Sequence, residues 1–500
     1  MPNNRIALVY QGSAPVPFAS GSEGPETDFR LCVHRSRACP VLMKLAVVVI
    51  SSVASVVSLE QNGLAQMQPP VPSTTMFEHV NVVPMDTERA MRNQNVLVEN
   101  GTITAIGPSL DVPAGASVID GHGTEYLSPG LADMHVHSTT SRDMAVLLAN
   151  GVTTVLNMGG ATTGFVDRVV PKLNRGELPG PHVYLSLKVD GTPEYGEWVI
   201  ATPEQARAVV GIAKTNGYDF IKVYNNLAPD VFQAFIDEGR KESIPVVGHG
   251  VTRIGIERQL AAGQLMVAHA EEYFYTVFFP PDADVGTQVP QMNQIAAAVG
   301  FTKRSGAYVT ADLNTYATIA AQWGKPGTVK AFLAMPTAQY VDPDTRIAWL
   351  HGGYDERKGS LQPRLQFLKI FVKALSDAGV PLIAGTDSPP IPGLVPGFSL
   401  HQDLHALEAA GLSRFQVLSS ATRTPGEMIA KAKPTAQRFG TITVGERADL
   451  ILSTGNPLED LSTLEHPLGV MVLGHWHDDK DLKKLLDGVA AEYRSVIDPQ

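Results

Sequence analysis

The sequence predicts an α/β protein in which a (β/α)8 barrel, or TIM barrel, carries a small β-sandwich domain formed from both terminal segments. Two observations support this. The middle of the chain alternates apolar, strand-like runs with helical stretches, and strand-rich segments with tight turns lie on both sides of it. About eight strand–helix repeats close a TIM barrel. We therefore expect one barrel with a second, smaller sheet domain.

The barrel strands are expected where short apolar runs are separated by helical stretches. One helix is marked clearly at its start: Thr202 is a suitable N-cap, Pro203 fits the first turn and Gln205 completes a capping box. The strand candidates are 131–137, 152–158, 182–188, 219–224, 245–249, 266–270, 307–311 and 381–387, and further helices are expected at 288–298, 312–323 and 361–379.

The sandwich is expected from short alternating strands near both ends of the chain. Between 77 and 127 the alternation and the dipeptide Asn100-Gly101 predict hairpins, and similar strands return in 440–455 and 469–477. We expect four parts, in order along the chain: 1–67, an upstream extension and signal peptide; 68–128, the first part of the sandwich; 129–432, the barrel; 433–500, the second part of the sandwich with a C-terminal tail.

The N-terminal region resembles an export signal. An apolar run at 45–59 follows Met43-Lys44, and small residues follow it. The run is short for a membrane span, so a signal peptide is favoured over the alternative of an anchoring helix. Both cysteines, Cys32 and Cys39, precede it, so the mature chain would contain no disulfide. We expect a secreted or periplasmic protein of bacterial type without stable membrane insertion after processing.

Metal-ligand residue types stand at the ends of the predicted strands. In GLADMHVHS, His135 and His137 point to the same face of a strand, because side chains alternate along it. Paired imidazoles suit a borderline divalent ion such as zinc. The other candidates follow later strands at the rim where TIM barrels place their active sites: Lys222, His249, His269 and Asp387.

Lys222 sharpens this prediction. In DFIKVY, Ile221 and Val223 share the face that would pack on the outer helices, whereas Phe220, Lys222 and Tyr224 would face the barrel interior. A buried lysine is costly unless it is paired, neutralised or bound. Two explanations remain open: an internal ion pair, or carboxylation of the amine to a carbamate that bridges two metals.

Together these segments resemble the amidohydrolase superfamily. The resemblance rests on GLADMHVH, IKVYNN, a histidine ending the fifth strand, AHAEE, AGTDS and the closing strand that begins at Gly445 and contains Arg447 to Ile451. Within the superfamily, the chain is most similar to the binuclear imidazolonepropionase-like and prolidase-like branch. The resemblance covers roughly residues 77–480, and its motifs are specific only in combination.

The resemblance implies a pair of divalent ions, expected to be Zn²⁺. It makes His135 and His137 ligands of the more buried metal, Lys222 the carboxylated bridge, and His249 and His269 ligands of the more exposed metal. Asp387 would bind the buried metal and transfer the proton. A metal-bridging hydroxide would then cleave the amide (C–N) bond of an N-acyl amino acid or an Xaa-Pro-type dipeptide. Tyr224 is a candidate for steadying the oxyanion or a substrate carboxylate; alternatively, it only packs.

Other functions remain open from sequence alone. The same ligand set could serve a lactonase or a phosphotriesterase, and a non-catalytic structural relative is a further alternative. The net charge of −11 argues against non-specific nucleic-acid binding. We expect a small-molecule substrate and a homo-oligomer. The aromatic segment 273–279 would form either an apolar lid or pocket wall for a hydrophobic acyl or aryl substrate, or an element buried against the inserted helices or a neighbouring subunit.

Overall fold

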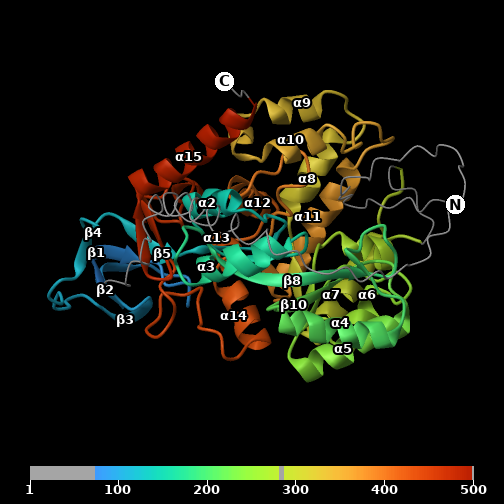
Figure 1. Cartoon of the computed structure of the whole chain (residues 1–500), viewed down its shortest axis with the longest axis horizontal. Coiled ribbons are helices and arrows are strands. Elements are labelled where there is room, and N and C mark those ends of the chain that lie inside the picture. Colours follow the sequence, from blue (N-terminus) through green and yellow to red (C-terminus); the bar gives the residue numbers. More distant parts are fainter. Residues whose placement is uncertain (1–73, 281–286, 498–500) are drawn as a thin grey trace, which may run out of the picture. The chain divides into compact units, whose positions relative to one another are not determined.

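The structure is a computed structural model, and it describes residues 74–280 and 287–497. The predicted signal peptide and upstream extension lie outside these ranges. Two sheets organise the described part of the chain (Figure 1). Within it, no helix is long and apolar enough to cross a membrane.

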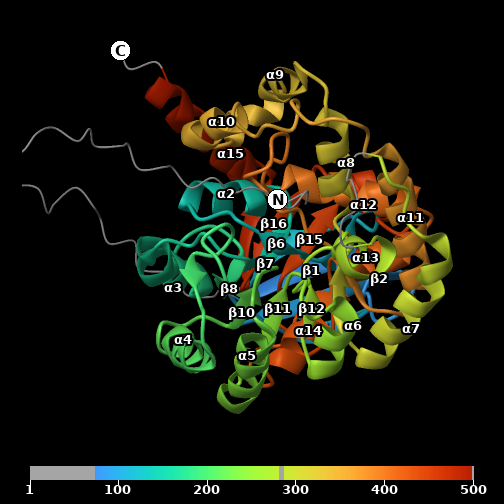
Figure 2. The ribbon, with the colours of Figure 1, turned by 90° about the vertical axis from the view of Figure 1, so that its right-hand side faces the viewer.

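The larger sheet is a barrel of eight parallel strands, as the sequence predicts. Its neighbours follow the order β14-β13-β12-β11-β10-β8-β7-β6, with a short β9 (Trp198–Val199) pairing only with β8. Helices surround these strands in Figure 2. The strands are β6 (Leu131–Val136), β7 (Val152–Asn157), β8 (His182–Asp190), β10 (Phe220–Val223), β11 (Val246–Gly248), β12 (Met266–Val267), β13 (Tyr308–Thr310) and β14 (Leu382–Ile383).

Backbone hydrogen bonds close the barrel between its first and last strands. The amides of Thr386 and Asp387 both donate to the carbonyl of His135, and Val136 forms a parallel bridge with Ser388. Gly385 permits this approach, because a Cβ at that position would lie 2.8 Å from the Cβ of His135. A glycine is therefore required where the seam closes.

The helices of the barrel cover its outer face. Thr202 and Gln205 form the expected capping box at the start of α4. The helix expected at 288–298 begins later, at Ile295, after a 3-10 turn. The helices are α2 (Ser141–Ala149), α3 (Val170–Asn174), α4 (Pro203–Thr215), α5 (Pro229–Glu242), α6 (Ile256–Ala262), α7 (Ile295–Ser305), α8 (Leu313–Gln322), α9 (Thr328–Leu333), α10 (Pro343–Trp349), α11 (Gln362–Asp377), α12 (Phe398–Ala409), α13 (Arg414–Ser420) and α14 (Arg423–Ala432).

The two faces of β10 have the parity that the sequence predicts. Ile221 and Val223 pack with the buried residues of α4 and α5, whereas Phe220 packs with inward side chains of other strands, among them Met266 and Ile383. Lys222 therefore points to the barrel interior.

The second sheet forms the β-sandwich domain and takes strands from both ends of the described chain. Its order is β17-β16-β15-β5-β1-β2-β3, with β4 beside β1. Asn100 and Gly101 both have positive φ, 51° and 75°, as the predicted β2–β3 hairpin turn requires. The strands are β1 (Thr75–Val82), β2 (Met91–Glu99), β3 (Thr102–Gly107), β4 (Ser117–Asp120), β5 (Tyr126–Pro129), β15 (Leu450–Ser453), β16 (Gly469–Val472) and β17 (His475–Asp478).

The C-terminal strands are joined tightly to the barrel. The amide of Gly130, just before β6, donates to the carbonyl of Asp449. Arg447 is buried, pairs with Asp449 and donates to the Thr154 hydroxyl on β7. Beyond β17, the helix α15 (Asp479–Ile497) packs on α2, where Val489 and Tyr493 contact the buried face of α2.

Candidate metal centre

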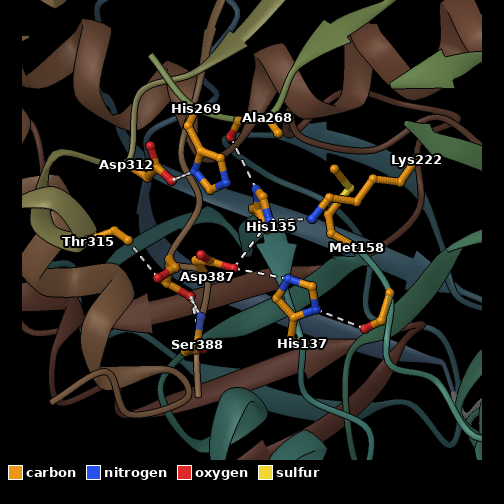
Figure 3. Close-up of polar contacts among 12 residues, drawn as sticks. His135, His137, Met158, Lys222, Ala268, His269, Asp312, Thr315, Asp387 and Ser388 are labelled. Atoms are coloured by element: carbon orange, nitrogen blue, oxygen red, sulfur yellow. Dashed lines mark hydrogen bonds and ion pairs between the residues drawn. The ribbon is translucent and has the colours of Figure 1, made fainter. Parts of the chain in front are cut away.

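Four histidines converge at the carboxyl ends of the barrel strands, and Figure 3 shows three of them, His135, His137 and His269. His135 lies on β6 and His137 just beyond it, while His249 follows β11 and His269 follows β12. The ring centroids of His135 and His269 are 4.4 Å apart, and those of His249 and His269 are 4.8 Å apart. The side chains are buried or nearly so, His137 being the most exposed at 10%. The fold thus gathers the four predicted histidine positions at one rim.

Each histidine has its Nδ1 atom held by a specific partner. The Nδ1 atom of His135 lies 3.1 Å from the carbonyl oxygen of Ala268, and that of His137 lies 2.9 Å from the carbonyl oxygen of Gly159. The Nδ1 atom of His249 bonds to Glu272, and that of His269 to Asp312. A carbonyl or carboxylate accepts from Nδ1–H, which leaves the Nε2 lone pair of each ring facing the site.

Lys222 and Asp387 complete the cluster. The Nζ atom of Lys222 lies 3.2 Å from Nε2 of His135. One oxygen of Asp387 lies 3.0 Å from Nε2 of His137 and 3.3 Å from Nε2 of His135. Asp387 has a positive φ of 55°, and its amide is bound to the His135 carbonyl, so the closing seam itself aims this carboxylate inward. The six predicted ligand positions therefore lie in one connected group.

Burial sets the protonation of these groups. It lowers the pKa values of all four histidines, with further lowering from the charge of Lys222, so the imidazoles are in the neutral form that binds metals. Burial also lowers the pKa of Lys222, to about 7. For Asp387 burial opposes ionisation, but the hydrogen bond and charge of His137 outweigh it and lower the pKa of Asp387 to about 2.

The donor set fits a divalent metal. Among the described residues, the Nε2 atoms of His249 and His269 are buried without a hydrogen-bond partner. Buried polar atoms rarely stay unsatisfied, so these two call for a ligand. Ligand atoms of His135, His269 and Asp387 lie within 4.8 Å of one another. Neutral imidazoles and one carboxylate are ligands that zinc accepts.

Tyr224 lies at the edge of this cluster. Its ring stacks on that of His249, with centroids 3.7 Å apart, and on that of Tyr195, with centroids 4.9 Å apart. Nζ of Lys222 is 5.6 Å from the Tyr224 ring centroid. The predicted tyrosine is thus part of the site wall, where it contacts one candidate ligand directly.

Two carboxylates in the site were not among the predicted residues. Glu272 bonds to His249 and also accepts from the amide of Gly250. Asp312 bonds to His269 from the end of β13. Glu272 follows His269 closely in AHAEE, and Asp312 follows a predicted strand, so strand-end position was an available signal. Sequence spacing alone does not show which histidine each carboxylate meets.

Asp133 links the two backbone segments that close the barrel, β6 and the segment after β14. It accepts hydrogen bonds from the amide and the hydroxyl of Thr386 and from the amide of His135. Burial raises the pKa of Asp133 to about 8, against these hydrogen bonds. Asp133 therefore fixes the two backbone segments that carry His135 and Asp387.

The aromatic segment is a packing element, one of the two alternatives left open above. Tyr273, Phe274 and Phe278 are fully buried. Phe278 contacts Phe367 and Phe371 of α11, with ring centroids 4.6 and 4.9 Å apart. The segment therefore fixes α11 against the barrel.

Comparison with known proteins identifies relatives by sequence. No family model matches the chain. A dihydroorotase of Geobacter sulfurreducens is 28% identical over 181 residues, which are 36% of this chain and 38% of that protein. A deacetylase of Brucella anthropi is 33% identical over 93 residues, or 17% of this chain and 23% of that protein. The chain thus spans less than two fifths of either relative's own length.

Solved structures match over most of the chain. Bottromycin amidohydrolase has a TM-score of 0.66 at 22% identity, over 84% of this chain and 90% of that one. A protein described as a putative prolidase from Bifidobacterium longum has a TM-score of 0.62 at 21% identity, over 84% of this chain and all of that one. These likenesses confirm the fold, and together with the sequence relatives they confirm the resemblance to the amidohydrolase superfamily.

Proposed function

We propose that this protein is a metal-dependent hydrolase that cleaves the amide bond of a small substrate, an N-acyl amino acid or an Xaa-Pro-type dipeptide. The observation that carries the proposal is the buried cluster of four neutral histidines, two of which have a free Nε2 atom, around the carboxylate of Asp387. The names of the relatives, which include a deacetylase and an Xaa-Pro dipeptidase, support C–N hydrolysis.

The residues divide into two candidate metal sites. His135, His137 and Asp387 would hold one ion, because their ligand atoms already contact one another. His249 and His269 would hold the second, with Lys222 as the shared ligand once its amine is carboxylated. Two divalent ions, Zn²⁺ by the chemistry of the donors, would polarise the substrate carbonyl and make a bound water more acidic.

Asp387 is the group that would move the proton. Its oxygen lies between His135 and His137, at the centre of the cluster, and its low pKa keeps it ionised at neutral pH. It would take a proton from the attacking water and deliver it to the nitrogen of the leaving amine. The amine leaves as a neutral group, which is why delivery of that proton matters for an amide.

Tyr224, in the wall of the site, would face the substrate. It is buried, and its ring stacks on that of His249. Burial raises the pKa of Tyr224 well above its ordinary value, so the phenol keeps its proton and can donate it in a hydrogen bond. We assign it to the developing oxyanion of the substrate carbonyl.

The test is an activity panel on protein loaded with zinc in the presence of bicarbonate. The panel contains N-acyl amino acids, Xaa-Pro dipeptides, lactones and aryl phosphotriesters. We expect turnover of an amide and about two metals per chain. Asp387→Asn should lower kcat by about 100-fold or more while most of the zinc is retained. Turnover confined to lactones or phosphotriesters, or to no substrate, would refute the proposal.

A further inference from the structure

A second inward-facing lysine lies next to the candidate metal centre. Lys188 on β8 is the register partner of Lys222 on β10, and its neighbours Leu187 and Val189 pack outward against α4 and α5. By parity, Lys188 therefore shares the interior face with Lys222. Its side chain is only 7% exposed. None of the roles given to the cluster above uses this buried cation.

The ammonium of Lys188 meets a carboxylate from the loop that follows β8. Its Nζ atom lies 3.3 Å from an oxygen of Glu197. The same oxygen accepts the amide of Gly160. Glu197 differs from Lys188 in burial, because 31% of its side chain is exposed. The anion of this pair thus reaches solvent, whereas the cation faces inward.

Lys188 also lies close to the segment that positions His137. The carbonyl of Gly159 is the partner of His137 Nδ1. A Cβ placed on Gly159 would be 2.8 Å from the Cβ of Lys188, so the lysine runs directly past this glycine. The side chain of Lys188 therefore lies against the segment that holds His137, one of the candidate ligands.

The loop that supplies Glu197 also supplies part of the site wall. Tyr195, two residues before Glu197, stacks on Tyr224, which in turn stacks on His249. Trp198, next in the chain, is 43% exposed. One short loop thus contacts Tyr224, which stacks on His249, and also Gly160, which follows the glycine that holds His137.

We propose that Lys188 anchors a carboxylate of the substrate, and that Glu197 occupies this anchor when no substrate is bound. This inference rests on the proposed function, and it names the substrate class: amides whose leaving amine carries a free carboxylate. A desolvated ammonium needs an anion, and an incoming carboxylate can replace one that is already partly in solvent. Displaced Glu197 can turn to water, because its side chain is already 31% exposed.

A purely structural ion pair makes different predictions for variants of the two residues. Lys188→Met keeps an unbranched side chain without charge, and Lys188→Arg keeps the charge. Glu197→Gln keeps an oxygen for the Gly160 amide but removes the competing anion. If the pair is only structural, losing either charge should affect charged and uncharged ligands equally.

The experiment measures binding to the zinc-loaded full chain by calorimetry. The probes are L-proline and L-leucine, each compared with its carboxamide, because a free amino acid is the product common to both proposed substrate types. We expect the parent to bind the carboxylate at least about 10-fold more tightly than the carboxamide, as one charge-assisted bond allows. Lys188→Met should abolish this preference, Lys188→Arg should retain it, and Glu197→Gln should tighten carboxylate binding several-fold.

Zinc content of each variant is measured in parallel, because a carboxylate anchor should not alter it. The inference is overturned if the parent binds the carboxylate and the carboxamide equally well, or binds neither. It is also overturned if Lys188→Met keeps the preference for the carboxylate, or if the variants bind both probes more weakly by the same factor. The amide panel on the same samples separates the two proposals. Amide turnover without carboxylate preference contradicts the anchor alone, and carboxylate preference without amide turnover contradicts the proposed reaction.

Discussion

Asp312 offers a direct measure of how the protein tunes a candidate metal ligand. Its carboxylate holds Nδ1 of His269, and both side chains are buried. Burial raises the pKa of Asp312 well above its ordinary value, but an ion on Nε2 of His269 would favour the ionised carboxylate at Nδ1. Asp312→Asn would then remove this charge with little change of shape. Asp312 has a φ of 29°, on the positive side where asparagine is among the best tolerated residues, so the variant adds little backbone strain.

The magnitude follows from the hydrogen bond that is weakened. A bond to a charged group contributes about 1.5–3 kcal/mol and a neutral one about 1 kcal/mol, and an asparagine oxygen can still accept from Nδ1. The loss is therefore about 0.5–2 kcal/mol, or about two- to thirty-fold in affinity for the ion that His269 would bind. Competition with a chelator, with zinc counted by mass spectrometry, measures this.

Asp403→Asn is the matched control. Asp403 is equally buried and accepts the amide of Asn314, close to Asp312, but no histidine contact is found for it in the described residues. Burial raises the pKa of Asp403 to about 8, so asparagine replaces a neutral carboxyl at pH 7. Zinc affinity should be unchanged in this variant. An Asp312→Asn variant that binds zinc as tightly as the Asp403→Asn control would refute the role given to Asp312.

Three further predictions concern other parts of the chain. Lys222→Ala should lose zinc and activity together. A variant that kept both in full would show that Lys222 bridges no metals and that the site is mononuclear. Burial raises the pKa of Asp143 to about 6, so the free energy of unfolding should fall between about pH 4 and pH 6, where the unfolded carboxyl ionises first. Asp143→Asn should remove this fall, so that above pH 6 the free energy of unfolding of the variant rises by up to about 3 kcal/mol relative to the parent. Denaturant unfolding of both proteins at pH 4 and pH 7.5 measures whether the fall is lost. We further predict an exported protein whose mature N-terminus lies between Ser55 and Gln68, and N-terminal sequencing that finds Met1 or Met43 would contradict this.

The barrel could be predicted from the sequence because residues with metal-binding side chains stand at the ends of the apolar runs that form its strands. Each apolar run that became a barrel strand matches a candidate, although β12 and β14 are shorter than expected. After Val267 and Ile383 the backbone leaves the ladder, so that His269 and Asp387 can turn into the site. Such shortening depends on tertiary contacts, which no local pattern encodes.

The parts that the sequence did not predict depend on pairing between distant loops. Asp312 and Glu272 acquire a role only because two particular histidines lie beside them. From sequence alone, Lys188 is a single charged residue within a strand. Its position beside Lys222 becomes known only from the pairing of β8 with β10. The start of α7 at Ile295 likewise follows a 3-10 turn that the apolar periodicity does not mark.

The closing seam has a consequence for folding. Asp133 and Thr386 are 253 residues apart in sequence, yet they are hydrogen-bonded directly beneath the backbone that presents His135 and Asp387. Contacts between such distant positions form late, since a long loop must close first. An ion held by His135 and Asp387 would act as a reversible cross-link between β6 and the segment after β14, the first and last strands of the barrel. Chelation should therefore accelerate opening of the seam, and amide hydrogen exchange at Asp387 would register the loss of the ion before any distant helix does.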